Sequence, residues 1–137
     1  FSVKVMDASA AIELLLGLPL AREIEAKLDE SEWEIAAPHL LVTEVLQVLR
    51  RRVASGLTSL ASAEEAMDLL DDLGIQYFGH DLLVDRVWDL RNNATAYDAS
   101  YLALSELIDS QLLTSDAKLV AVPGSVADVF LVGVGSK

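Results

Sequence analysis

The sequence has no cysteine and only two histidines, His39 and His80. The lack of cysteine excludes disulfides, zinc–thiolate sites and thiol nucleophiles, and it suits the reducing cytoplasm, where we expect the protein to work. Two histidines are too few for a metal site built mainly from imidazole. Any metal ion would therefore be held by oxygen, which favours Mg²⁺ or Mn²⁺ over zinc or copper.

Long apolar runs are also missing, although 53% of the residues are hydrophobic. The apolar stretch over residues 12–20 is interrupted by Glu13 and is much shorter than the roughly 20 residues of a membrane-spanning helix. We expect no membrane segment and no signal peptide, and a chain that opens on Phe1 is typical of a processed chain or a cloned segment. A length of 137 residues predicts one domain over residues 1–137.

Positive charge is scarce, because 22 acidic residues face only 10 basic ones, for a net charge of −12. Proteins that bind nucleic acid by releasing counterions are usually basic. The overall charge therefore argues against a nucleic-acid partner unless positive charge is supplied from outside the chain.

Short strand-like segments alternate with amphipathic helical segments along the whole chain. Strands are expected over residues 1–6, 33–37, 75–78, 111–114 and 126–132. Helices are expected from Asp7 or Ser9 to Leu16, over residues 19–30, from Pro38 to about Ser55, from Ser59 or Ser62 to Gly74, from Asp81 to about Asn92 and from Thr95 to about Asp109, with a helical turn over residues 117–120. This order predicts an α/β fold with a parallel central sheet of four to five short strands, flanked by helices on both faces.

Four acids stand apart from the charged, solvated helix faces that hold most of the others: Asp7, Glu44, Asp98 and Asp116. Asp7 and Asp116 come at the ends of predicted parallel strands, where open α/β sheets bind ligands. Asp98 lies in the first turn of its helix, and Glu44 lies in the second turn of another, on an otherwise apolar face. A buried carboxylate needs a partner, a shifted pKa or a metal. With no buried lysine or arginine evident, the four acids indicate a cation from outside the chain.

Each of these acids also has a purely structural interpretation. Asp7 is a typical helix N-cap, Asp98 follows Thr95 at capping-box spacing, and Asp116 is typical of a turn. Glu44 is the hardest to explain by structure alone, because it interrupts an apolar stripe. The prediction of a metal site therefore rests on the four acids together.

Four segments resemble those of PIN-domain ribonucleases, and among them the toxins of VapBC toxin–antitoxin pairs: VMDASAAIELLLG, APHLLVTEVLQVLRRR, TAYDASYLALSE and LLTSDAKL. The resemblance implies a single PIN-like domain with Mg²⁺- or Mn²⁺-dependent endoribonuclease activity. It also implies a homodimer that is inhibited by a cognate VapB-like antitoxin. The family's catalytic and metal-binding acids fall on Asp7, Glu44, Asp98 and Asp116.

Two hydroxyls and four arginines complete the expected site. The family's hydroxyl positions fall on Ser9 and Thr114, which we expect to hydrogen-bond to the metal-binding carboxylates and orient them. Candidate contacts with RNA, or with an acidic segment of the antitoxin, are Arg50, Arg51, Arg52 and Arg91.

Other protein classes also place an aspartate after their first strand. A phosphatase of the haloacid dehalogenase type requires a second aspartate two residues later, where this chain has Ser9. A phosphoacceptor receiver domain requires paired acids after the first strand, whereas Asp7 is single. Two alternatives stay open: a non-catalytic, metal-binding PIN-like interaction module, and a PIN-type nuclease that acts on DNA.

Overall fold

A computed structural model describes residues 3–134, which form three layers. The middle layer is a five-stranded parallel sheet in the order β3-β2-β1-β4-β5. The strands are β1 (Lys4–Met6), β2 (Ile35–Pro38), β3 (Gln76–Phe78), β4 (Gln111–Thr114) and β5 (Val129–Leu131). The predicted α/β class and parallel sheet are thus confirmed.

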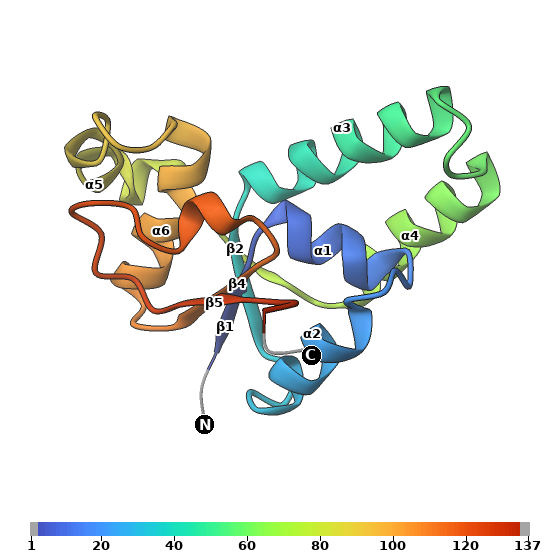
Figure 1. The fold of residues 1–137 in the computed structure, drawn as a ribbon, viewed down its shortest axis with the longest axis horizontal. Helices are drawn as coiled ribbons and strands as arrows, with labels where there is room; N and C mark the ends of the chain where they lie inside the picture. The colour runs from blue at the N-terminus through green and yellow to red at the C-terminus, as the bar shows by residue number, and fades with distance from the viewer. Residues whose placement is uncertain (1–2, 135–137) are drawn as a thin grey trace.

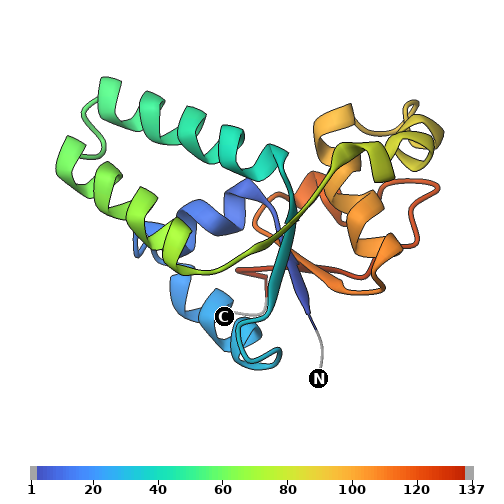
Figure 2. The same cartoon turned by 180° about the vertical axis from the view of Figure 1, so that it is seen from behind.

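Helices cover both faces of the sheet (Figure 1 and, from behind, Figure 2). The helices are α1 (Ala8–Leu15), α2 (Ala21–Asp29), α3 (Leu40–Ala54), α4 (Leu60–Asp72), α5 (Val84–Asp89) and α6 (Ala96–Leu107), with short 3₁₀ turns η1 (His80–Leu82) and η2 (Ala117–Leu119). On one face α1 packs against α2, α3 and α4, and on the other α6 packs against β1, β2, β4 and α5. Within residues 3–134, no helix is both long and apolar enough to cross a bilayer.

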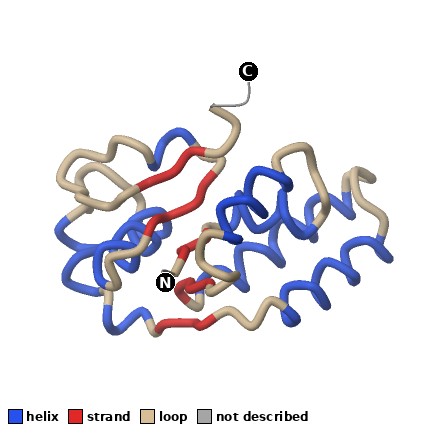
Figure 3. Tube along the Cα trace, turned by 90° about the horizontal axis from the view of Figure 1, so that it is seen from below, coloured by secondary structure: helices blue, strands red, loops and turns tan. Residues whose placement is uncertain are grey.

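The end of β1 lies at the point where the order of the strands reverses: β2 and β3 lie on one side of β1, and β4 and β5 lie on the other. The chain runs from β1 outward through β2 to β3 and then returns to place β4 on the other side of β1. Seen from below, the strands lie between two groups of helices (Figure 3). In this register Met6 lies opposite Leu113, so that Asp7 and Thr114 emerge side by side. Open α/β sheets bind ligands at such a switch point.

Most predicted elements are present, but several boundaries were wrong. The strand expected from residue 33 begins at Ile35, because Glu32 and Trp33 adopt positive φ angles of 52° and 59° in the preceding turn. Pro38 is the last residue of β2 and does not start a helix. It pairs with Phe78 of β3, and the hydrogen bond to the Phe78 carbonyl comes from the His39 N–H. The expected strand over 126–132 is only Val129–Leu131. Residues 1–2 of the first predicted strand lie outside the described residues.

For one helix start the structure decides between the two predicted residues, and another predicted start was wrong. Ser59, not Ser62, caps α4, because its hydroxyl oxygen accepts a hydrogen bond from the Ser62 N–H at 3.0 Å. The helix expected from Asp81 begins only at Val84, because η1 turns the chain so that Leu83 enters the core, where it is 1% exposed. Thr95 caps α6 as predicted.

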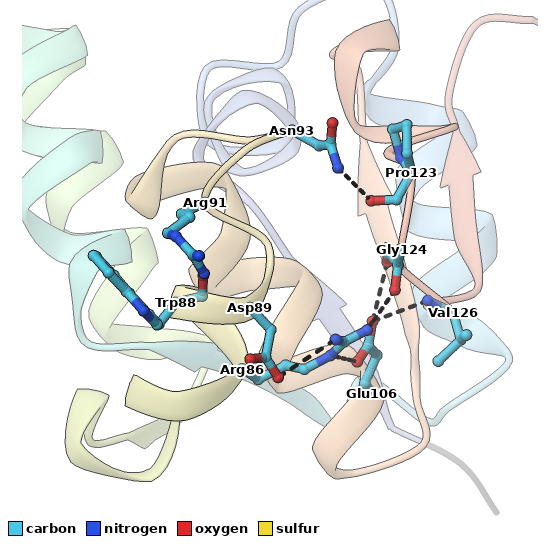
Figure 4. A network of polar contacts seen from close by, with 10 residues as sticks. Arg86, Trp88, Asp89, Arg91, Asn93, Glu106, Pro123, Gly124 and Val126 are labelled. Carbon is cyan, nitrogen blue, oxygen red and sulfur yellow. Dashed lines mark hydrogen bonds and ion pairs between the residues drawn. The ribbon is translucent and has the colours of Figure 1, made fainter.

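A partly buried ion pair joins α6 to α5 and to the loop before β5 (Figure 4). Arg86 donates hydrogen bonds to Glu106 at 2.6 and 3.3 Å and to the Gly124 carbonyl at 2.6 Å. Glu106 also accepts hydrogen bonds from the Ser125 hydroxyl and the Val126 N–H. Burial alone raises the pKa of Glu106, but these hydrogen bonds hold it below its ordinary value. The carboxylate therefore stays charged and holds three segments together.

We expect Glu106→Gln to lower the free energy of unfolding by about 1–3 kcal/mol, because Arg86 and the backbone groups around it lose the charge of the carboxylate that accepts their hydrogen bonds. The matched control is Asp89→Asn, which removes a carboxylate that is 63% exposed and 3.9 Å from the same Arg86. It should change stability by less than about 0.5 kcal/mol. Urea unfolding at pH 7 measures both values, and equal effects of the two variants would contradict this account.

Candidate active site

Asp7 occupies the switch point of the sheet. Its Oδ1 accepts hydrogen bonds from the Ala10 N–H at 2.9 Å, as the N-cap of α1, and from the Ser9 hydroxyl at 2.7 Å. Its Oδ2 accepts a hydrogen bond from the Thr114 hydroxyl at 2.5 Å. Asp7 is only 5% exposed. Asp7 therefore caps the helix and is also a buried carboxylate, two roles that the sequence left as alternatives.

The two hydroxyls beside Asp7 are fixed by the chain that follows β4. Each hydroxyl gives its hydrogen to Asp7 and accepts a backbone hydrogen bond in return. The Ser115 N–H donates to Ser9 Oγ, and the Asp116 N–H donates to Thr114 Oγ1, both at 2.9 Å. The loop after β4 therefore holds both hydroxyls in the orientation that serves Asp7.

Burial raises the pKa of Asp7 from 3.8 to about 6. The hydrogen bonds from Thr114, Ala10 and Ser9 oppose this rise, and the nearby negative charge of Asp116 adds to it. The site thus holds a carboxylate that is charged at neutral pH against a desolvation penalty. A nearby cation would remove that penalty.

Asp98 and Asp116 lie near Asp7 and near each other, because the charge of Asp116 affects the pKa of both other acids. Burial raises the pKa of Asp98; the positive charge of Lys118 lowers it and the negative charge of Asp116 raises it. Asp116 caps η2 by accepting a hydrogen bond from the Lys118 N–H at 3.0 Å, and Lys118 Nζ lies 3.7 Å from Asp116 Oδ2. The Thr95 hydroxyl oxygen accepts a hydrogen bond from the Asp98 N–H at 3.1 Å, and the Thr95 side chain also lowers the pKa of the Asp98 carboxyl.

Glu44 reaches the site from α3. Its Oε1 accepts a hydrogen bond from the Tyr101 hydroxyl at 2.5 Å. Negative charge on Glu44, Asp7 and Asp98 contributes to a raised pKa of Tyr101, for which burial is the largest cause. Tyr101 therefore lies among three of the four predicted acids, and Asp116 interacts electrostatically with Asp7 and Asp98.

The donor set suits a hard divalent cation, because every candidate ligand is a carboxylate oxygen. Among residues 3–134, however, no three acidic or histidine side chains already converge as the ligands of one ion. The acids share one region but stand apart from one another, so binding an ion requires the half-buried Asp98 and Asp116 side chains to close on it. The expectation that no lysine is buried was wrong: Lys4 is 6% exposed, but it is paired with Glu30 at 3.0 Å, at the opposite end of β1.

The four predicted arginines have no hydrogen bond or ion pair to these acids within residues 3–134. Arg50 donates to Gln47, and Arg52 donates to Thr58 in the turn after α3. In Figure 1 the end of α3 that carries the arginines points away from the sheet. Arg91 lies 4.7 Å from the centre of the exposed Trp88 ring (Figure 4).

Two residues at the site were missed from the sequence, Tyr101 and Lys118. Tyr101 follows Asp98 by three residues and so shares its helix face, which is a usable signal. Lys118 had no such signal, because its position depends on how η2 folds after β4.

Comparison with known proteins gives the family. The family model for the PIN domain matches residues 4–125. The chain belongs to the PIN-domain family. This PIN domain is 40% identical over 130 residues to Ribonuclease VapC1 of Mycobacterium tuberculosis, covering 93% of this chain and 96% of that protein. It is 34% identical over 115 residues to Ribonuclease VapC9 of the same species, covering 84% and 87%. The relationship to VapC proteins is confirmed.

A solved structure shares the fold of this PIN domain. The crystal structure of PAE2754 from Pyrobaculum aerophilum superimposes with a TM-score of 0.68, covering 93% of this chain and 83% of that one. Its sequence identity is 21%, so the likeness concerns the fold alone.

The raised pKa of Asp7 makes the stability of the PIN domain depend on pH. The folded state binds the Asp7 proton more tightly than the unfolded state, so the stability gained from the protonated form is complete below pH 3.8 and is lost as the pH rises through about 6. The Asp7→Asn variant has no titratable group at this position. The stability of Asp7→Asn relative to the native protein should therefore increase by up to about 3 kcal/mol between pH 4 and pH 7.

Urea unfolding in EDTA at several pH values measures this difference. Asp89→Asn, which changes an exposed acid, is the control and should track the native protein. A difference between Asp7→Asn and the native protein that stays constant with pH would show that Asp7 is not buried in this way.

Proposed function

We propose that this PIN domain is a metal-dependent endoribonuclease of the cytoplasm and the toxin of a toxin–antitoxin pair. The observation that carries the proposal is the buried Asp7 carboxylate at the switch point of the sheet, with Asp98, Asp116 and Glu44 around it. The relatives named VapC ribonucleases, which match nearly the whole chain, support RNA as the substrate class.

We assign Asp7, Asp98 and Asp116 to binding Mg²⁺ or Mn²⁺, and Glu44 to a second ion or to the orientation of water. Such an ion, when bound, would activate water and offset charge on the phosphate during phosphodiester hydrolysis. Asp7 contributes a carboxylate whose direction is set before any ion arrives. Asp98 and Asp116 come from more exposed positions and would move to complete the site.

A metal-centred site also answers the objection from charge. The chain carries a net charge of −12, but a bound cation supplies positive charge where the scissile phosphate must lie. Lys118, with its side chain 76% exposed beside Asp116, is the nearest basic group to the acids by the contacts of residues 3–134. It is well placed to contact a neighbouring phosphate.

An apolar groove between α3 and α4 supports the proposal of an antitoxin. Its volume is about 460 Å³, and its apolar lining includes Leu46, Leu49, Val53, Leu60 and Met67. Exposed apolar surface of this kind usually marks a protein partner. We assign it to the antitoxin, and protection of α3 and α4 amides from hydrogen exchange on adding the antitoxin would test this.

We also propose a homodimer. Leu82, Val84 and Trp88 are each more than half exposed on η1 and α5, and α5 lies on the other side of the sheet from α3 and α4 (Figure 1). A second copy could cover these side chains while the groove stays free. Sedimentation at several protein concentrations measures the oligomeric state, and a monomer at high concentration would remove this part of the proposal.

Asp7→Asn and Asp98→Asn should each lower the rate of RNA cleavage by at least about a hundredfold, since they remove a metal-binding oxygen from the site. Both variants should remain folded. Asp68→Asn, on the exposed face of α4, is the matched control and should cut RNA at the native rate.

The same assay separates the alternatives. Cleavage of structured RNA by the native protein should stop in EDTA and return with Mg²⁺ or Mn²⁺. Cleavage of DNA in its place would favour a DNA-directed nuclease, and no cleavage of either would leave a non-catalytic module. Native-rate cleavage by Asp7→Asn or Asp98→Asn would overturn the assignment of the acids.

We propose that Arg50, Arg51 and Arg52 steer RNA. Their replacement by glutamine, in the inactive Asp98→Asn background, should weaken RNA binding and flatten its salt dependence. The slope should fall by roughly 0.7 units of log K per log[salt] for each phosphate that the arginines no longer neutralise. Lys118→Gln, which removes one positive charge, gives a reference value for the change in the salt slope. An unchanged slope in the triple variant would remove the arginines from the RNA path and leave an acidic antitoxin segment as their partner.

A further inference from the structure

Tyr101 connects the two helical layers at the carboxylate site. It lies one turn after Asp98 on α6, and it is one of the largest fully enclosed side chains, at 2% exposed. Its hydroxyl donates to Glu44 of α3, which lies on the other side of the sheet in Figure 1. The 2.5 Å hydrogen bond spans 57 residues of sequence and joins α6 to α3 above the sheet edge.

In this contact the Tyr101 hydroxyl is the hydrogen-bond donor and the Glu44 carboxylate is the acceptor. A phenol has one hydrogen to give, and it is given to Glu44 Oε1. Among residues 3–134, Glu44 Oε2 accepts no hydrogen bond, so this oxygen stays available to a cation.

Glu44 has no other polar contact to hold it in the described part of the chain. It lies between the buried Leu41 and Val45 on α3 and is itself only partly exposed. A glutamate has three side-chain torsions, and an unanchored carboxylate would turn toward water. The Tyr101 hydroxyl is the group that keeps it over the acids.

We propose that Tyr101 is a positioning residue, whose buried hydroxyl holds the Glu44 carboxylate at the metal site. This inference rests on the proposed metal-dependent function. A phenylalanine would fill the same space in the core, so the hydroxyl itself serves the orientation of Glu44. Polar partners of this kind behind metal-binding side chains typically affect metal affinity by ten- to a hundredfold when they are removed.

The test is the affinity of the purified full chain for Mn²⁺, measured by titration calorimetry, with RNA cleavage as a second readout. Tyr101→Phe should bind Mn²⁺ at least about tenfold more weakly than the native protein and need a correspondingly higher Mn²⁺ concentration for half-maximal cleavage. Tyr97→Phe is the matched control, because Tyr97 is on the same helix but 62% exposed, with no hydrogen bond from its hydroxyl within residues 3–134. It should bind Mn²⁺ like the native protein.

A double-mutant cycle distinguishes positioning from a general effect on the fold. If Tyr101 acts through Glu44, adding Tyr101→Phe to Glu44→Ala should cause no further loss of Mn²⁺ affinity. An equal loss in both backgrounds would show a structural role and overturn the proposal. Should Tyr101→Phe fail to fold, Glu44→Asp withdraws the carboxylate from the hydroxyl instead, and native Mn²⁺ affinity in that variant would overturn it.

The outcome also separates this proposal from the proposed function. If the native protein neither binds Mn²⁺ nor cuts RNA, the proposed function fails. If the native protein does both and Tyr101→Phe matches it, only the role of Tyr101 fails.

Discussion

The buried carboxylate of Asp7 sets the conditions that the surrounding structure must meet. A lone carboxylate in an apolar interior is unfavourable, and its pKa of about 6 records that cost. Ser9, Ala10 and Thr114 offset part of it with hydrogen bonds. Because the sheet order places β4 beside β1, Thr114 is at hand although it is 107 residues away in sequence. The strand order of the sheet therefore determines which groups can stabilise the Asp7 carboxylate.

The basic residues of the chain explain why the site calls for an outside cation. The more enclosed basic side chains of residues 3–134 pair with acids away from the site. Lys4 and Lys27 pair with Glu30, and Arg86 pairs with Glu106. At the site itself, the exposed Lys118 pairs with Asp116, and its charge also lowers the pKa of Asp98. One exposed lysine does not balance four acids, and this is the condition under which a divalent ion binds with advantage.

Sequence patterns predicted the fold more closely than the site. The strand over 111–114 matches β4, and Thr95 caps α6 as its spacing indicated, because both signals are local. Pro38 was misread because its position in β2 depends on pairing with β3, which lies far along the chain. The four acids could be singled out by their apolar surroundings. The contact between Tyr101 and Glu44 could not, since it depends on how α6 and α3 meet above the sheet.

The central claim is that these carboxylates bind one divalent-metal centre, and anomalous diffraction from crystals soaked in Mn²⁺ tests it most directly. The account predicts an anomalous peak between Asp7, Asp98 and Asp116, with their carboxylate oxygens as ligands and Glu44 facing the same space. The peak should vanish in crystals of Asp7→Asn. A well-occupied Mn²⁺ elsewhere on the protein, with no peak at Asp7, would contradict the account.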